Sequence, residues 1–91
     1  MNRAMRPLKI LVYGNLPIEA LVAAGHAVHR ADTIPRAVAA AEEKNPDVLV
    51  MDDRDPTGDS QRLARMLTWV RGTPSVDISE APRRLIPAGR G

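Results

Sequence analysis

The 91-residue chain contains no cysteine and no phenylalanine, and it has a single tryptophan and a single tyrosine. The absence of cysteine excludes disulfide bonds and thiolate metal ligands, and it fits a reducing compartment, so a cytoplasmic location is expected. The shortage of aromatic residues argues against base-stacking platforms for nucleic acids. The core must therefore be built from aliphatic side chains, which are plentiful because hydrophobic residues make up 44% of the chain.

Long apolar runs are also missing. No run approaches the roughly 20 residues that cross a bilayer, so no membrane partner is expected. The basic start of the chain leads into an apolar run that is interrupted at Lys9 and ends at Gly14. Residues 1–7 are therefore predicted to be a flexible basic tail rather than a signal peptide. A chain of this length makes one small domain.

The net charge of +2 is small, but arginines gather at the two ends of the chain. Arg3 and Arg6 lie at the front, and Arg83, Arg84 and Arg90 lie at the back. Solvated tails are the simpler interpretation of these arginines. A contact of Arg83 and Arg84 with an acidic partner is the alternative, and a nucleic-acid partner is not favoured, because no aromatic residues interleave with the arginines.

Predicted strands and helices alternate along the chain. Apolar, β-branched segments bounded by Gly, Pro, Asn or Asp predict strands at residues 8–13, 27–31, 48–52 and 75–79. Three helices are expected between them. The first is expected to be capped by Asn15 with Pro17 in its first turn, the second by Asp32 or Thr33, and the third by Asp59 or Ser60. An apolar stripe of Leu63, Met66, Leu67 and Val70 marks the third helix.

This alternation predicts a parallel sheet with right-handed crossovers. The first and third strands are continuously apolar, which suits central positions, whereas the second and fourth carry charges, which suits edges. The predicted fold is a small three-layer α/β sandwich with a four-stranded sheet of order 2-1-3-4. Residues 8–79 form the single domain. Residues 80–91, rich in Pro, Gly and Arg, are expected to be a tail with little regular structure.

In the predicted strand order the winding direction reverses between the first and third strands. Ligands of open α/β sheets bind at such a switch point, beyond the carboxyl ends of the strands. The residues expected there are Gly14 and Asn15 after the first strand, Asp52 and Asp53 after the third, and Ser79 after the fourth. These residues form the candidate switch-point pocket.

The segment NPDVLVMDDRDPTGD resembles the phosphoacceptor region of receiver domains of two-component response regulators. It has a Pro-Asp pair, an apolar strand, an Asp, and a Pro four residues later. TPSVDIS resembles the fourth receiver strand, and KILVYGN resembles the first. The resemblance implies a flavodoxin-like fold in which Asp52 is the phosphoacceptor and Ser79 is the hydroxyl that senses the phosphoryl group.

The chain departs from the receiver pattern at the groups that perform the chemistry. Receivers end their first strand with an acidic pair that holds Mg²⁺, and here those positions are Gly14 and Asn15. The Lys of the fifth strand has no counterpart. Phosphoryl transfer needs its charge neutralised by metal and cation. We therefore expect a truncated pseudo-receiver that is not an enzyme, with no metal site and no cofactor.

The function expected from these features is regulation or assembly through protein–protein contacts. Trp69 is expected to be half-buried beside its helix stripe, or else to anchor a partner. The edge of the fourth strand could be covered by the C-terminal tail or by a second subunit in a homodimer. Two alternatives are a phosphoaccepting signalling receiver that uses Asp52 and a nucleic-acid accessory protein that uses the Arg-rich ends. His26 and His29 are expected to be surface or half-buried residues.

Overall fold

The computed structural model describes residues 6–86. Within these residues four strands and four helices alternate, and the strands form one parallel sheet of order β2-β1-β3-β4, as predicted. The strands are β1 (Lys9–Tyr13), β2 (Ala27–Ala31), β3 (Val48–Met51) and β4 (Ser75–Asp77). The helices are α1 (Glu19–Ala23), α2 (Ile34–Lys44), α3 (Asp59–Arg71) and α4 (Ala81–Leu85).

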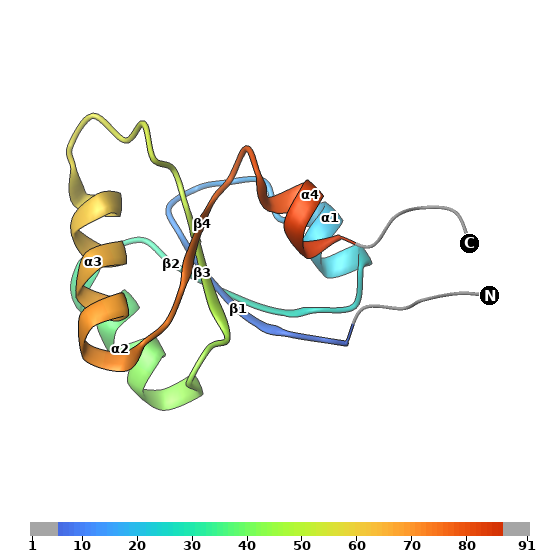
Figure 1. Cartoon of the computed structure of the whole chain (residues 1–91), viewed down its shortest axis with the longest axis horizontal. Coiled ribbons are helices and arrows are strands. Elements are labelled where there is room, and N and C mark those ends of the chain that lie inside the picture. The colour runs from blue at the N-terminus through green and yellow to red at the C-terminus, as the bar shows by residue number, and fades with distance from the viewer. Residues whose placement is uncertain (1–5, 87–91) are drawn as a thin grey trace.

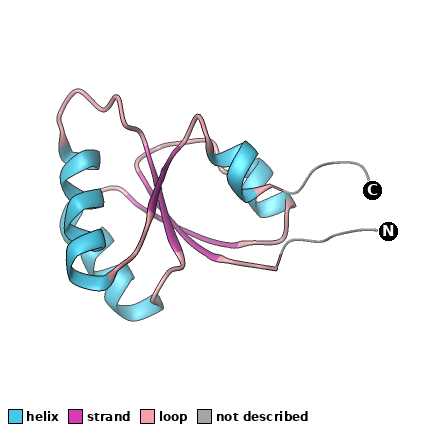
Figure 2. Cartoon of the chain, viewed as in Figure 1, coloured by secondary structure: helices cyan, strands magenta, loops and turns pink. Residues whose placement is uncertain are grey.

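The sheet lies between two layers of helices. Figure 1 shows α2 and α3 on one face and α1 and α4 on the other, and Figure 2 shows the sheet strands crossing between them. Side chains of successive residues in the central strands point alternately toward the two helix layers. Leu11 and Leu49 pack toward α2 and α3, whereas Ile10 and Val50 pack toward α1 and α4. The predicted three-layer α/β sandwich is therefore correct.

Two of the three predicted helix starts need correction. Thr33 caps α2 as expected, since its Oγ1 accepts a hydrogen bond from the Arg36 N–H at 3.2 Å. The prediction that Asn15 caps the first helix is wrong, because α1 begins at Glu19 after Ile18. At α3 the N-cap residue is Gly58, which has a φ of +79° and no side chain to offer. The capping oxygens of α3 come instead from an aspartate upstream in the loop.

The buried face of α3 is shifted from the predicted stripe. Leu63 and Leu67 are buried as expected, but they are joined by Ser60 and Ala64. The prediction that Val70 belongs to the core is wrong, since it is 75% exposed, and Trp69 is 88% exposed rather than half-buried. The reason is geometric: α3 packs on β3 and α2 through the face that carries Leu63, Ala64 and Leu67, which leaves Trp69 and Val70 facing solvent.

The C-terminal segment contains a helix where a tail was expected. The prediction of little regular structure at residues 80–91 is wrong for residues 81–85, which form α4. Ala81 and Leu85 are buried against the layer that contains α1. The folded domain therefore extends past residue 79. Residues 87–91 of that predicted tail, and residues 1–5 of the N-terminal one, lie outside the described residues.

A buried histidine joins α4 to the start of β1. His26 is 6% exposed, so its prediction as a surface or half-buried residue is wrong. Its Nδ1 accepts a hydrogen bond from the Leu8 N–H at 3.0 Å, and its Nε2 lies 2.6 Å from the Leu85 carbonyl oxygen. Since Nδ1 accepts, the neutral ring with its proton on Nε2 satisfies both contacts.

The two edges of the sheet are β2 and β4. Edge β4 has three residues, and no further strand within residues 6–86 pairs with it. The expectation that the tail covers this edge is wrong for the segment up to residue 86, because α4 packs beside α1 on a face of the sheet. Pairing of a second subunit with β4 stays a prediction. No helix in the described part of the chain has the length and apolar character needed to cross a membrane.

Candidate functional site: the carboxyl ends of the strands

The predicted switch-point residues lie in loops at the same end of the sheet. Gly14 and Asn15 follow β1, Asp52 and Asp53 follow β3, and Ser79 lies just after β4. Gly14 has a φ of +97°, and its N–H donates to the Ala31 carbonyl at 2.9 Å. The loop after β1 therefore begins at a glycine whose backbone still pairs with β2. Because glycine has no side chain, this position offers the site only backbone groups.

Asp52 is half-buried directly after β3, and its carboxylate is used by its own loop. Oδ1 of Asp52 accepts a hydrogen bond from the Arg54 N–H at 2.9 Å, and its carbonyl oxygen accepts one from the Asp55 N–H at 3.1 Å. Within residues 6–86 no side chain donates a hydrogen bond to Asp52. The geometry is that of an aspartate that shapes a turn.

Asp77 connects the loops after β3 and β4, and the sequence analysis did not identify it as a site residue. Its Oδ1 accepts a hydrogen bond from the Asp53 N–H at 2.6 Å, and its Oδ2 accepts the Ser79 N–H at 2.9 Å together with the Ser79 hydroxyl. The hydroxyl of Ser79, followed by these backbone donors, holds the pKa of Asp77 below its usual value. Ser79 is therefore engaged with Asp77.

Asp55 supplies the capping oxygens for α3. It accepts hydrogen bonds from the N–H and hydroxyl of Thr57 at 3.0 and 2.8 Å, and from the N–H and hydroxyl of Ser60 at 3.1 and 2.9 Å. The Thr57 donors, followed by those of Ser60, lower the pKa of Asp55. Asp59, which was expected to cap the helix, instead pairs with Arg62 at 3.1 Å.

Three carboxylates lie close enough to Tyr13 to act on its hydroxyl. Burial raises the pKa of the Tyr13 hydroxyl, and the charges of Asp59, Asp55 and Asp32 raise it further. Even so, no group of three or more His, Cys, Asp or Glu side chains suited to holding a metal ion occurs in the described segment, residues 6–86. The aspartates are spread over several turns, and two of them, Asp55 and Asp77, already accept hydrogen bonds with both oxygens.

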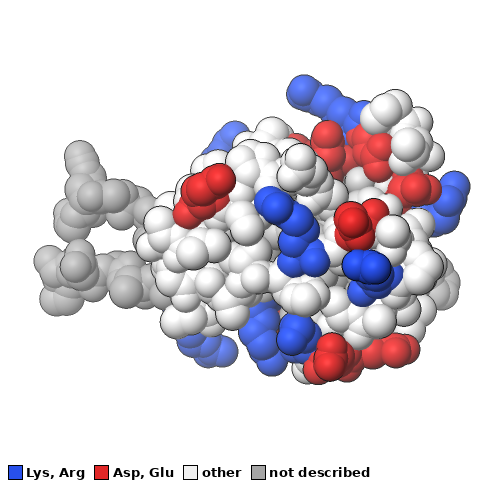
Figure 3. Space-filling model, turned by 180° about the vertical axis from the view of Figure 1, so that it is seen from behind, with Lys and Arg blue, Asp and Glu red and all other residues white. Residues whose placement is uncertain are grey.

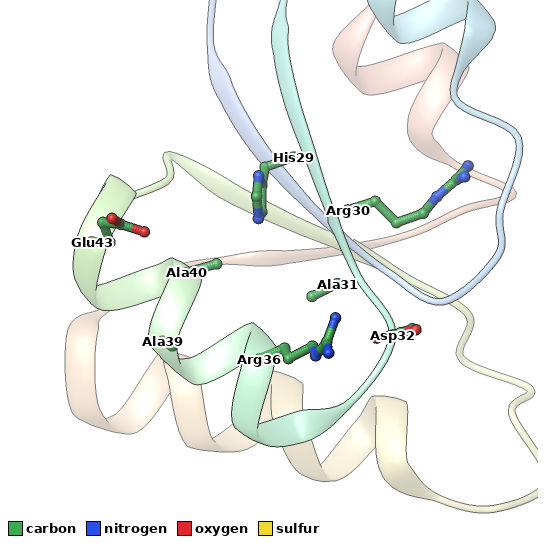
Figure 4. Close-up of a pocket in the computed structure, with 8 residues that line it drawn as sticks. All are labelled: His29, Arg30, Ala31, Asp32, Arg36, Ala39, Ala40 and Glu43. Carbon is green, nitrogen blue, oxygen red and sulfur yellow. The ribbon is translucent and has the colours of Figure 1, made fainter.

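The predicted partner contacts lie on opposite layers. Trp69 is on the outer surface of α3, whereas the exposed Arg83 and Arg84 are on α4, across the sheet. A small partner therefore cannot contact all three from one side. A hollow of about 490 Å³ lies elsewhere, between β2 and α2, and Figure 4 shows the side chains that line it. It does not include the switch-point residues.

The fold is similar to that of a solved structure. That structure is the anti-anti-sigma factor PhyR from Bartonella quintana, with a TM-score of 0.62 and 19% sequence identity. The match covers 96% of this chain but 39% of that one, so this chain spans well under half of its length. No protein-family model and no curated protein sequence matches the chain. The likeness establishes the architecture as a receiver-like α/β fold.

The two lowered carboxyl pKa values predict an acid-sensitive fold. Because the pKa of Asp55 and Asp77 is below the ordinary 3.8 in the folded chain, their ionised forms stabilise it above that pH, and the contribution is lost as the pH falls through the folded pKa. We expect the free energy of unfolding to decline from about pH 4 downward. Urea unfolding followed by circular dichroism at a series of pH values measures this decline.

The variants Asp55→Asn and Asp77→Asn should each make the acid decline shallower. Asp53→Asn is the matched control, because only the backbone of Asp53 takes part in hydrogen bonds within residues 6–86. If all three variants decline as steeply as the parent chain, the hydrogen bonds to Asp55 and Asp77 do not stabilise the fold.

Proposed function

We propose that this chain is a receiver-like regulatory module that acts through contacts with other proteins and carries out no phosphoryl transfer. The observation that carries the proposal is the pair Trp69 and Val70, which are 88% and 75% exposed on a helix of a small domain. Burying two large apolar side chains against a partner is favourable, and Trp is enriched among residues that dominate binding energy.

The chemistry at the carboxyl ends of the strands supports the non-catalytic part of the proposal. A phosphoryl group on Asp52 would add charge to a region that already holds several aspartates, and Gly14 and Asn15 offer neither a carboxylate for Mg²⁺ nor a cation. The Ser79 hydroxyl, which would have to respond to such a group, is bound to Asp77. This arrangement suits a degenerate receiver in which the scaffold is kept without its switch.

The structural neighbour supports the regulatory part. The protein with the same fold is named an anti-anti-sigma factor, which describes a regulator that opposes another regulatory protein. We extend only that general mode of action to this chain. We place the expected homodimer at the edge of β4, with which no further strand within residues 6–86 pairs.

Replacing Trp69 with alanine is expected to weaken partner binding by tenfold or more, because truncating an interface hot spot costs about 2 kcal/mol or more. The full chain, immobilised and exposed to lysate of its host, retains partners that quantitative mass spectrometry measures. Val22→Ala is the control, since Val22 is 52% exposed on the opposite layer. As the only tryptophan, Trp69 also reports its own burial by a blue shift of fluorescence.

Two outcomes would contradict the proposal. One is retention of the same proteins, in the same amounts, by the parent chain and by Trp69→Ala. The other is a phosphoryl adduct in the intact mass after incubation with acetyl phosphate and Mg²⁺, provided that Asp52→Asn abolishes it. The second outcome would favour the phosphoaccepting signalling receiver.

A further inference from the structure

The outer edge of β2 has unpaired backbone groups. In a parallel ladder, successive residues direct their N–H and C=O alternately to the two sides of the strand. Ala27 donates to the Leu8 carbonyl and Ala31 accepts from the Gly14 N–H, so the odd-numbered residues of β2 face β1. The N–H and C=O groups of Val28 and Arg30 therefore face outward. This edge is five residues long, against three for β4.

A channel runs beside this edge on the side of α2. The hollow of about 490 Å³ in Figure 4 and a second one of about 220 Å³ share His29 and Ala40. Together they follow β2 from Ala27 to Asp32. The channel exists because α2 faces the strand with alanines, which are too short to fill the space. Alternate side chains of a strand added to β2 would point toward this channel.

More cations than acids surround the channel. The side chains of Lys9, Arg36 and Lys44 line the two hollows, against two acids, Asp32 and Glu43. The Arg30 side chain points away from α2 (Figure 4) and donates to the Leu16 carbonyl at 2.6 Å. The ion pair found within residues 6–86, between Arg62 and Asp59, is elsewhere. Figure 3, which views the molecule from the side opposite to Figure 1, shows basic side chains gathered across the middle of this face and acidic ones mostly toward its rim.

The charges favour one occupant over another. A second copy of the chain, paired edge to edge through β2, would bring the same three cations of both copies together, and like charges on adjacent strands are destabilising. An acidic strand would instead place its carboxylates near Arg36 and Lys44 while its backbone pairs with Val28 and Arg30. Strand addition of this kind takes affinity from the main chain and specificity from the alternate side chains.

We propose that the β2 edge and its channel bind an extended acidic segment of a partner protein by strand addition. The proposal rests on the proposed function, since it names a surface and a chemical class for the protein contact. It concerns a face that does not include Trp69, and so the two can be tested separately.

The probe is a short synthetic peptide in which Glu alternates with Val, labelled for fluorescence anisotropy and mixed with the full chain. Two control peptides have the same length: one replaces Glu with Lys, and one keeps Glu but is N-methylated at every amide, so that neither of its edges can pair with a strand. We expect the acidic peptide alone to bind, and to slow hydrogen exchange of the Val28 and Arg30 amides.

The variant Arg36→Glu/Lys44→Gln should lower the affinity for the acidic peptide about fivefold, as the loss of two exposed charge contacts implies. Arg65→Glu/Arg84→Gln makes the same change in net charge away from the channel and should bind as the parent chain does. Val28→Pro removes one outward N–H without touching the ladder to β1, and it should also weaken binding.

Equal binding of the acidic peptide and its N-methylated form would overturn strand addition, and equal binding of the Lys peptide would overturn the charge argument. A dimer whose Val28 and Arg30 amides are already protected would show that a second copy occupies the edge. If no peptide binds while Trp69→Ala still abolishes partner retention, this inference fails and the proposed function stands. If the acidic peptide binds and Trp69→Ala retains its partners as the parent chain does, the channel is the binding site and Trp69 does not contribute to it.

Discussion

Replacing His26 with alanine is expected to lower the free energy of unfolding by about 3 kcal/mol. The substitution empties a buried site and leaves two buried backbone groups, the Leu8 N–H and the Leu85 carbonyl, without their partner. An unsatisfied buried polar group costs about 1–3 kcal/mol, and two are created at once. For a domain of this size the melting temperature should fall by about 15 °C.

Thermal and urea unfolding of His26→Ala measures the effect, and His29→Ala is the matched control. His29 is exposed on β2, and its side chain makes no hydrogen bond within residues 6–86. Its removal should change stability by less than about 0.5 kcal/mol. A loss below about 1 kcal/mol in His26→Ala would show that the imidazole contacts contribute little.

The second large effect is expected at the inner face of α3. Leu63→Ala should destabilise the domain by about 3 kcal/mol, because Leu63 is fully buried against the sheet and its truncation leaves a cavity. Val70→Ala, on the same helix, should change the free energy of unfolding by no more than about 0.5 kcal/mol, since Val70 is largely exposed. Urea unfolding of both variants at neutral pH compares the two faces.

A larger loss in Val70→Ala than in Leu63→Ala would mean that α3 is turned about its axis relative to the structure, with the predicted stripe inward. The comparison therefore tests the helix orientation on which the exposure of Trp69 depends. Circular dichroism of each variant separates local repacking from loss of the helix.

Much of the architecture could be predicted from local patterns. The continuous apolar runs of β1 and β3 and the charges in β2 and β4 determine which strands are central, and the predicted order follows from them. The Thr33 cap and the bounds of β2 were also predicted correctly. These features depend on residues close together in sequence, which is why periodicity and capping rules identify them.

The features that were missed depend on contacts between distant segments. Pro82 appeared to break regular structure, but it lies in the first turn of α4, where its missing N–H costs nothing. The face of α3 was predicted from apolar residues at helical spacing, but the structure buries the small Ser60 and Ala64 in place of Met66 and Val70. The role of Asp77 arises only when β3 and β4 are adjacent, because its donors come from both loops.

At the candidate site the positions could be predicted and the interactions could not. Strand ends place Asp52, Asp53 and Ser79 at one end of the sheet, as the parallel order requires. Which carboxylate takes which donor depends on loop conformation. In the structure the Ser79 hydroxyl donates to Asp77, and Asp55 accepts the hydrogen bonds that cap α3. Both interactions differ from what a motif comparison implies.

The imidazole of His26 also fastens the two ends of the folded segment to each other. Leu8 and Leu85 are far apart in sequence, yet each contacts one nitrogen of the same ring. The fold is in this sense a closed loop, in which the two ends of the described segment are held together through His26. Circular permutation is tolerated where the termini are adjacent. A permuted chain with a short linker between these ends, and with new termini in the loop before α3, would therefore preserve the strand order that defines the domain.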